Sequence, residues 1–135
     1  MRARISDAVD RRFRAELGFP LALWEVLVIL SKAPATRLRM VDLSRRMLVS
    51  KSNVTQLVDK LEQAGLIERE ASASDRRLVY ATLTPAGTGA VRRGSGIFND
   101  AAHEHFARHM TGNELRTVLS GLTKVMAANA SDCLE

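Results

Sequence analysis

Residues 50–69 read SKSNVTQLVDKLEQAGLIER, and this stretch decides the fold. Its apolar residues recur at the spacing of one helix face, which predicts a helix over residues 51–64 with Ser50 as its N-cap. Gly65 stands where a left-handed residue ends a helix, and the pattern then changes to the period of a strand. The helical stripe consists of Val54, Leu57, Val58 and Leu61.

Opposite this stripe, the start of the helix carries short polar and amide side chains. Asn and Gln pair bidentately with adenine, and Ser and Thr hydrogen-bond to several bases. A short helix predicted over residues 39–48 precedes it across a tight break, which is the helix-turn-helix arrangement. An ordinary solvated helix face is the other interpretation of this pattern alone. As DNA contacts of the recognition helix we expect Ser50, Lys51, Ser52, Asn53, Thr55 and Gln56.

The residues that follow predict a hairpin. Residues 66–70 and 77–83 alternate as two strands, and the small residues of 71–75 form the loop between them. Arginines on a protruding hairpin can enter a narrow minor groove, where the negative potential is concentrated. A solvated turn with a surface ion pair is the alternative. The predicted wing-tip residues are Asp75, Arg76 and Arg77.

Helices are predicted on both sides of this lobe. The spacing of apolar residues predicts helices over 5–17 and 21–33, the second apolar nearly all round and therefore buried. Thr84-Pro85 opens a long helix to about His109, and a capping box at 111–114 opens the last one. A two-fold partner would cover the apolar face of the terminal helices and place two recognition helices about 34 Å apart. The candidate interface residues are Val9, Phe13, Phe98, Leu119 and Leu122.

The fold class expected is therefore mainly α with a small β-hairpin wing, a winged helix-turn-helix with N- and C-terminal dimerisation helices. Residues 1–135 form one domain, in which 21–84 are the DNA-binding lobe and 1–20 and 85–135 are the dimerisation helices. The net charge of +5 favours an anionic partner. Residues 37–77 carry nine Lys or Arg against six acids, and the expected phosphate contacts are Arg37, Arg39, Arg45 and Arg46.

Three stretches resemble the MarR family of winged helix-turn-helix regulators. Residues 50–69 are similar to its recognition helix and first wing strand, 75–77 to its wing-tip motif, and 83–87 to its Leu-Thr-x-x-Gly entry to the long helix. The resemblance implies a triangular dimer made by the first helix and the last two, with Arg76 or Arg77 in the minor groove. It also implies a repressor on a pseudo-palindromic operator, released by a small phenolic or lipophilic effector.

Two other functions stay open from the sequence. His105 and His109, near His103, are spaced as one helical turn, which would suit a zinc-responsive regulator. A winged helix used for protein–protein contact is the second. We expect no enzyme, cofactor or metal, because the histidines cluster in one helix without a nucleophile elbow or phosphate loop. Cys133 is expected to be a free thiol, and the absence of an apolar signal core or long apolar run predicts a cytoplasmic protein.

Overall fold

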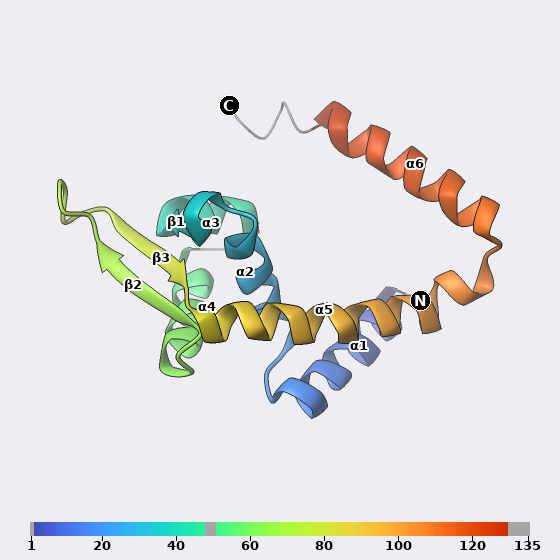
Figure 1. Cartoon of the computed structure of the whole chain (residues 1–135), viewed down its shortest axis with the longest axis horizontal. Coiled ribbons are helices and arrows are strands. Elements are labelled where there is room, and N and C mark those ends of the chain that lie inside the picture. The colour runs from blue at the N-terminus through green and yellow to red at the C-terminus, as the bar shows by residue number, and fades with distance from the viewer. Residues whose placement is uncertain (1, 48–50, 130–135) are drawn as a thin grey trace. The chain divides into compact units, whose positions relative to one another are not determined.

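The computed structural model describes residues 2–47 and 51–129 and confirms a mainly helical chain with a small antiparallel sheet (Figure 1). The chain divides into two compact units, Met1–Phe98 and Asn99–Glu135. The first contains α1 (Arg2–Leu17), α2 (Leu21–Ser31), a 3-10 turn (Pro34–Thr36), β1 (Arg37–Arg39), α3 (Met40–Met47), α4 (Lys51–Gln63), β2 (Ile67–Ala71) and β3 (Val79–Leu83). The long helix α5 (Pro85–His105) begins in the first unit and ends in the second, which also contains a 3-10 turn (Ala107–His109) and α6 (Gly112–Asn129).

The core of the first unit forms around α2. This helix is apolar nearly all round, as the sequence predicts, and Val26, Leu27 and Leu30 are fully buried. Side chains of α3, α4 and the sheet close over it, so the helix-turn-helix and the wing share one core. The same core includes residues of α3, α4 and the sheet: Leu43, Val54, Val58, Leu61, Ile67 and Ala81.

A carboxylate from α1 caps α2. Pro20 precedes α2 and offers no side-chain cap. Asp10 replaces it, since its Oδ1 accepts a hydrogen bond from the Leu21 amide at 2.9 Å and its Oδ2 accepts one from Arg14 at 2.6 Å. The Arg14 hydrogen bond, followed by the Leu21 amide, holds the pKa of Asp10 below its ordinary value. Gly18, at φ +77°, closes the end of α1 in the left-handed conformation.

The sheet has three strands, one more than the sequence predicts. β1 adds to the hairpin in the order β1-β3-β2, with Leu38 opposite Ala81. Both of these residues are buried, so the strand is held by one apolar contact and its backbone pairing. A three-residue strand with a charged residue on each side of one leucine has too little alternation to be recognised from sequence.

The end of α4, the start of β2 and the start of α5 meet in one hydrogen-bonded corner. The Thr84 hydroxyl donates to the Gly65 carbonyl at 2.7 Å and accepts from the Gly87 amide at 3.0 Å. The Thr84 amide donates to the Leu66 carbonyl at 3.1 Å. A Cβ at position 87 would overlap that same carbonyl oxygen, so only glycine lets α5 approach the chain here.

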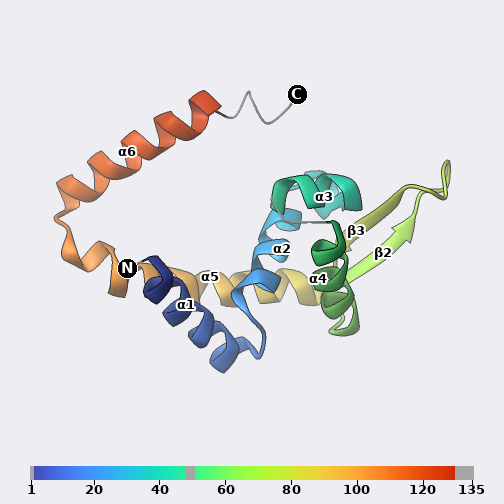
Figure 2. The ribbon, with the colours of Figure 1, turned by 180° about the vertical axis from the view of Figure 1, so that it is seen from behind.

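Within the first unit, α5 passes beside α2 (Figure 2). Trp24 of α2 holds the two helices together. Its indole Nε1 donates to the Val91 carbonyl at 3.2 Å, and its ring lies 5.2 Å from Phe13 and 5.4 Å from Phe98, centre to centre. Gly94 lies against the same indole, and a Cβ at that position would overlap Nε1. Three aromatic side chains and one glycine therefore join α1, α2 and α5 within the first unit.

The second unit contains the last residues of α5. The sequence predicts a helix to about His109, but α5 stops at His105 and a separate 3-10 turn follows. The cause is Phe106, whose φ of −134° and ψ of −66° lie outside helical values.

The predicted capping box at the start of α6 is present, since the Thr111 amide donates to Glu114 Oε2 at 2.7 Å and the Glu114 amide donates to Thr111 Oγ1 at 3.3 Å. Within residues 2–47 and 51–129, no helix combines the length and the apolar character needed to cross a bilayer.

We expect alanine substitutions at two glycines of α5 to change the free energy of unfolding in opposite directions. Gly96 has open space around its Cβ position, so Gly96→Ala stabilises the protein by up to about 1 kcal/mol through helix propensity. Gly94→Ala must displace the indole, which costs about 1–3 kcal/mol as overpacking. Urea unfolding followed by the fluorescence of the single tryptophan measures both. Equal stabilisation by the two variants would contradict the Trp24–Gly94 contact.

Candidate nucleic-acid interface

α4 has one buried and one exposed side. Val54, Val58 and Leu61 point into the core. The predicted recognition residues for which side chains are described lie on the other side and are exposed: Ser52, Asn53, Thr55 and Gln56. Lys51 is the first residue of α4, and Ser50 lies outside the described residues. The exposed side chains therefore occupy the first two turns, at the positive end of the helix dipole.

The wing is a hairpin with a hydrogen-bonded tip. β2 and β3 pair from Ile67 opposite Leu83 to Ala71 opposite Val79. Beyond the strands, the Ser72 amide donates to the Leu78 carbonyl at 2.8 Å and the Leu78 amide donates to the Asp75 carbonyl at 3.0 Å. The tip extends past the other elements of the first unit (Figure 1).

Asp75 holds Arg77 in one orientation at this tip. Its carboxylate accepts hydrogen bonds from the Arg77 amide at 3.0 Å, from Nε at 3.2 Å and from Nη2 at 3.3 Å. The Arg77 side chain and then its amide hold the pKa of Asp75 below its ordinary value, so the carboxylate stays charged at neutral pH. Arg77 itself is 91% exposed, and Arg76 beside it is also exposed.

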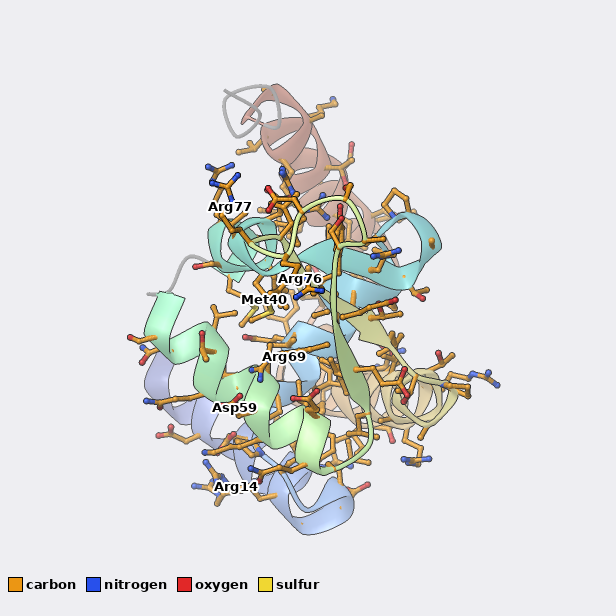
Figure 3. All side chains as sticks on the ribbon, turned by 90° about the vertical axis from the view of Figure 1, so that its left-hand side faces the viewer. Arg14, Met40, Asp59, Arg69, Arg76 and Arg77 are labelled. Atoms are coloured by element: carbon orange, nitrogen blue, oxygen red, sulfur yellow. The ribbon has the colours of Figure 1, made fainter. Side chains whose placement is uncertain are left out.

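Arg69 joins the wing to α4, and the sequence analysis did not single it out (Figure 3). From the middle of β2, its Nη2 donates to Asp59 at 2.5 Å and to the Thr55 carbonyl at 3.1 Å, and its Nη1 donates to Glu62 at 3.2 Å. The available signal was a pair of acids one turn apart on α4, followed by an arginine on the strand that faces the helix.

The four predicted phosphate contacts differ in their surroundings. The Arg37 guanidinium lies 4.0 Å from the centre of the Tyr80 ring. Because Leu38 opposite Ala81 is buried, strand alternation places Arg37 on the sheet face away from Arg69 and α4. Asp42 pairs with Arg39 at 2.8 Å and lies 3.7 Å from Arg45. Arg45 and Arg46 are exposed in the last turn of α3.

A cavity of about 420 Å³ lies between α3, α4 and the wing. Most of its wall is apolar, and Thr55 of α4 and Arg77 of the wing both contribute to it, so the recognition helix and the wing are neighbours on one side of the unit. Figure 3 shows both elements facing the viewer, with Met40 between them. The lining residues are Arg39, Met40, Val41, Ser44, Val54, Thr55, Arg69, Arg77, Leu78 and Val79.

The candidate dimer residues fall into two groups. Phe13 is fully buried within the first unit and Val9 is 7% exposed. Phe98, at the end of that unit, is 41% exposed. In the second unit, Leu119 and Leu122 are each more than half exposed. They belong to the apolar side of α6, on which Leu115 and Val118 are half-buried and the other four residues are exposed: Leu119, Leu122, Val125 and Met126.

The histidines do not form the arrangement that a zinc site requires. His105 ends α5 while His109 belongs to the 3-10 turn, so they are not one turn apart on a continuous helix. His109 Nε2 accepts a hydrogen bond from Arg108 at 3.3 Å. In the described part of the chain, no three His, Cys, Asp or Glu side chains come together as a metal site, and Cys133 lies outside that part.

The chain is similar to one family of proteins and to several transcriptional regulators. The family model described as "MarR family" matches residues 19–79. The HTH-type transcriptional regulator MhqR of Bacillus subtilis is 36% identical over 75 residues, which are 56% of this chain and 45% of that protein. The HTH-type transcriptional repressor Mb2911 of Mycobacterium bovis is 33% identical over 92 residues, 68% of this chain and 65% of that protein. The chain spans about half the length of the first curated relatives it matches.

A solved structure gives the same fold. Sco3205 from Streptomyces coelicolor, a MarR family transcriptional regulator crystallised in complex with DNA, superposes with a TM-score of 0.80. The two chains are 27% identical, and the alignment covers 95% of this chain and 79% of Sco3205. The likeness therefore extends well beyond the 61 residues that the family model matches.

Proposed function

This chain belongs to the MarR family, and on that premise we propose that it is a homodimeric transcriptional repressor that binds double-stranded DNA at a pseudo-palindromic operator. The observation that carries the proposal is the adjacency of the polar start of α4 and the wing tip, which both line one cavity on the same side of the unit. A recognition helix and an arginine-tipped wing on one side suit simultaneous contact with a major groove and a neighbouring minor groove. Such a repressor acts in the cytoplasm.

In this proposal α4 reads base edges and the wing anchors it. Ser52, Asn53, Thr55 and Gln56, preceded by Ser50 and Lys51, enter the major groove, where hydroxyl and amide side chains distinguish base pairs. Arg77, with Arg76 beside it, enters the minor groove. Because Asp75 already orders the Arg77 side chain, binding loses less rotamer entropy than a freely moving arginine would.

Phosphate contacts are proposed for the arginines nearest α4. Arg45 and Arg46 are exposed at the end of α3, in the helix that precedes the recognition helix, and Arg39 lines the cavity beside it. Arg37 packs on the Tyr80 ring and does not line this cavity, so it contributes to the long-range potential rather than to a direct contact.

A second copy of the chain is the proposed cover of the apolar side of α6. Four exposed and two half-buried apolar residues on one side of a helix in a small protein favour association. Phe98, Leu119 and Leu122 would contact the partner directly. Val9 and Phe13 are already buried within one subunit, so they would support the interface residues without contacting the partner. Residues 21–84 would then form each DNA-binding lobe, with 1–20 and 85–135 as the dimerisation helices.

The cavity between α3, α4 and the wing is the proposed site of a small phenolic or lipophilic effector. Its volume of about 420 Å³ suits a small organic molecule, and its walls carry Met40, Val54 and Val79. A ligand there touches both DNA-binding elements. It would release DNA by favouring a wing position that does not fit the duplex.

Arg77→Ala is expected to weaken binding by about 1–3 kcal/mol on a duplex that the wild-type protein selects from a random pool. The melting temperature should not change, because the side chain is 91% exposed. Gel shift at several salt concentrations measures the loss, and wild-type affinity should fall steeply as salt rises. Arg92→Ala, an exposed arginine on α5, is the control with the same charge change. Equal losses in the two variants would remove the wing from the proposal.

Leu122→Glu is expected to convert a dimer into a monomer. Burying a charge in an apolar interface costs several kcal/mol when it has no partner. Sedimentation should give the wild type a mass twice that of the 14.9 kDa chain and the variant a mass of one chain. Ser120→Glu places the same charge on the opposite side of α6 and should leave the dimer intact. A monomeric wild type would contradict the proposed assembly.

Val79→Phe, which narrows the cavity, is expected to abolish the response to an effector while keeping DNA binding. The probe is a panel of simple phenols, namely phenol, cresol and naphthol, tested for a rise in melting temperature and for release of the selected duplex. Binding to the folded state alone raises the melting temperature. If a phenol acts on the wild type and on Val79→Phe equally, the effector uses another site.

A further inference from the structure

Arg69 contacts α4 along one line of the helix. Its acceptors are the Thr55 carbonyl, the Asp59 carboxylate and the Glu62 carboxylate, and its own amide also donates to Glu62 at 3.3 Å. Residues 55, 59 and 62 follow each other at spacings of four and three, so they share one helix face and span about 10 Å of the axis. One strand residue thus fixes both the rotation and the tilt of α4.

The Arg69 hydrogen bonds are well suited to fixing the angle between the wing and α4. Only 24% of the Arg69 side chain is exposed, and its planar guanidinium donates in fixed directions. Arg69 also lies at the base of the wing, in the middle of β2. The tip lies about five strand residues further on, roughly 15 Å, so a tilt of a few degrees at Arg69 moves Arg77 by about 1 Å.

We propose that Arg69 is a positioning residue that sets the angle between the wing and α4, so that the two elements fit the two grooves of one duplex together. The inference rests on the proposed function and adds a residue to it that touches no DNA. Three of the five guanidinium N–H groups already donate to acceptors on α4, which favours a role of Arg69 through α4 and the wing. The contribution of Arg77 to DNA binding then depends on Arg69.

The experiment is a double-mutant cycle on the duplex selected by the wild-type protein. Arg69→Met keeps an unbranched apolar stem and removes the side-chain hydrogen bonds. Arg77→Ala is expected to weaken binding ten- to hundredfold in the wild type and less than threefold in Arg69→Met, because a misplaced wing no longer meets the minor groove. The same loss in both backgrounds, which is the additivity of independent sites, would overturn the inference.

Two further measurements separate positioning from direct DNA contact and from stability. The number of ions released on binding, measured from the slope of log affinity against log salt concentration, should be unchanged in Arg69→Met. In Arg77→Ala it should be lower by about one. The melting temperature should change little, because partly exposed ion pairs contribute little to stability. A lower salt dependence in Arg69→Met would make Arg69 a phosphate contact and overturn the positioning role.

Asp59→Asn leaves the arginine unchanged and tests the inference by whether DNA affinity rises or falls. Removing a carboxylate close to DNA by itself tightens binding, because the carboxylate repels the phosphates. If Asp59 serves to hold Arg69, Asp59→Asn instead weakens binding to the selected duplex at least threefold and does not weaken binding to a random duplex. Tighter binding to both duplexes would overturn the inference. Glu68→Gln, an exposed acid on the other face of β2, is the matched control and should not weaken either.

These outcomes are distinct from a failure of the proposed function. If the wild-type protein shows no salt-sensitive binding to any duplex, the repressor proposal and the inference fall together. If the wild type binds and Arg77→Ala weakens it equally in both backgrounds, the repressor proposal stands and only the role of Arg69 is lost.

Discussion

The corner built on Thr84 is the constraint on which the other elements of the first unit depend. The Thr84 hydroxyl accepts a hydrogen bond from the Gly87 amide and donates one to the Gly65 carbonyl. It therefore both caps α5 and holds the chain at the end of α4. The neighbouring Thr84 amide binds the Leu66 carbonyl, where the wing begins. The recognition helix, the wing and the long helix therefore diverge from one point.

Much of this arrangement could be predicted from local chemistry. The stripe of α4, the left-handed Gly65, the Thr84-Pro85 start of α5 and the capping box at Thr111 are signals carried by a few consecutive residues, and each appears where it was expected. Features that depend on distant partners could not be predicted in this way. β1 exists because Leu38 finds Ala81, and α5 stops at His105 because of the backbone at Phe106.

In the candidate DNA-binding site, too, local features could be predicted and contacts between distant residues could not. The polar side of α4 and the wing-tip arginines follow from residue type and periodicity. The Arg69 contacts link residues that are seven to fourteen positions apart on different elements, and only the fold brings them together. Arg37 was grouped with its neighbours by charge, yet strand alternation sends it to the Tyr80 side of the sheet. The sequence thus identifies which residues carry charge but not which arginines of the strands and helices pair with an acid, as Arg39 does with Asp42.

The close fit of Gly94 against Trp24 restricts how α5 can move within the first unit. Because a Cβ in the place of Gly94 would overlap the indole, contact with Trp24 opposes sliding of α5 along its axis. The hydrogen bond to Val91 opposes rotation about the helix axis in the same way. These two contacts therefore favour movement of α5 and α2 together, so that a displacement of α5 would be passed to the core around α2.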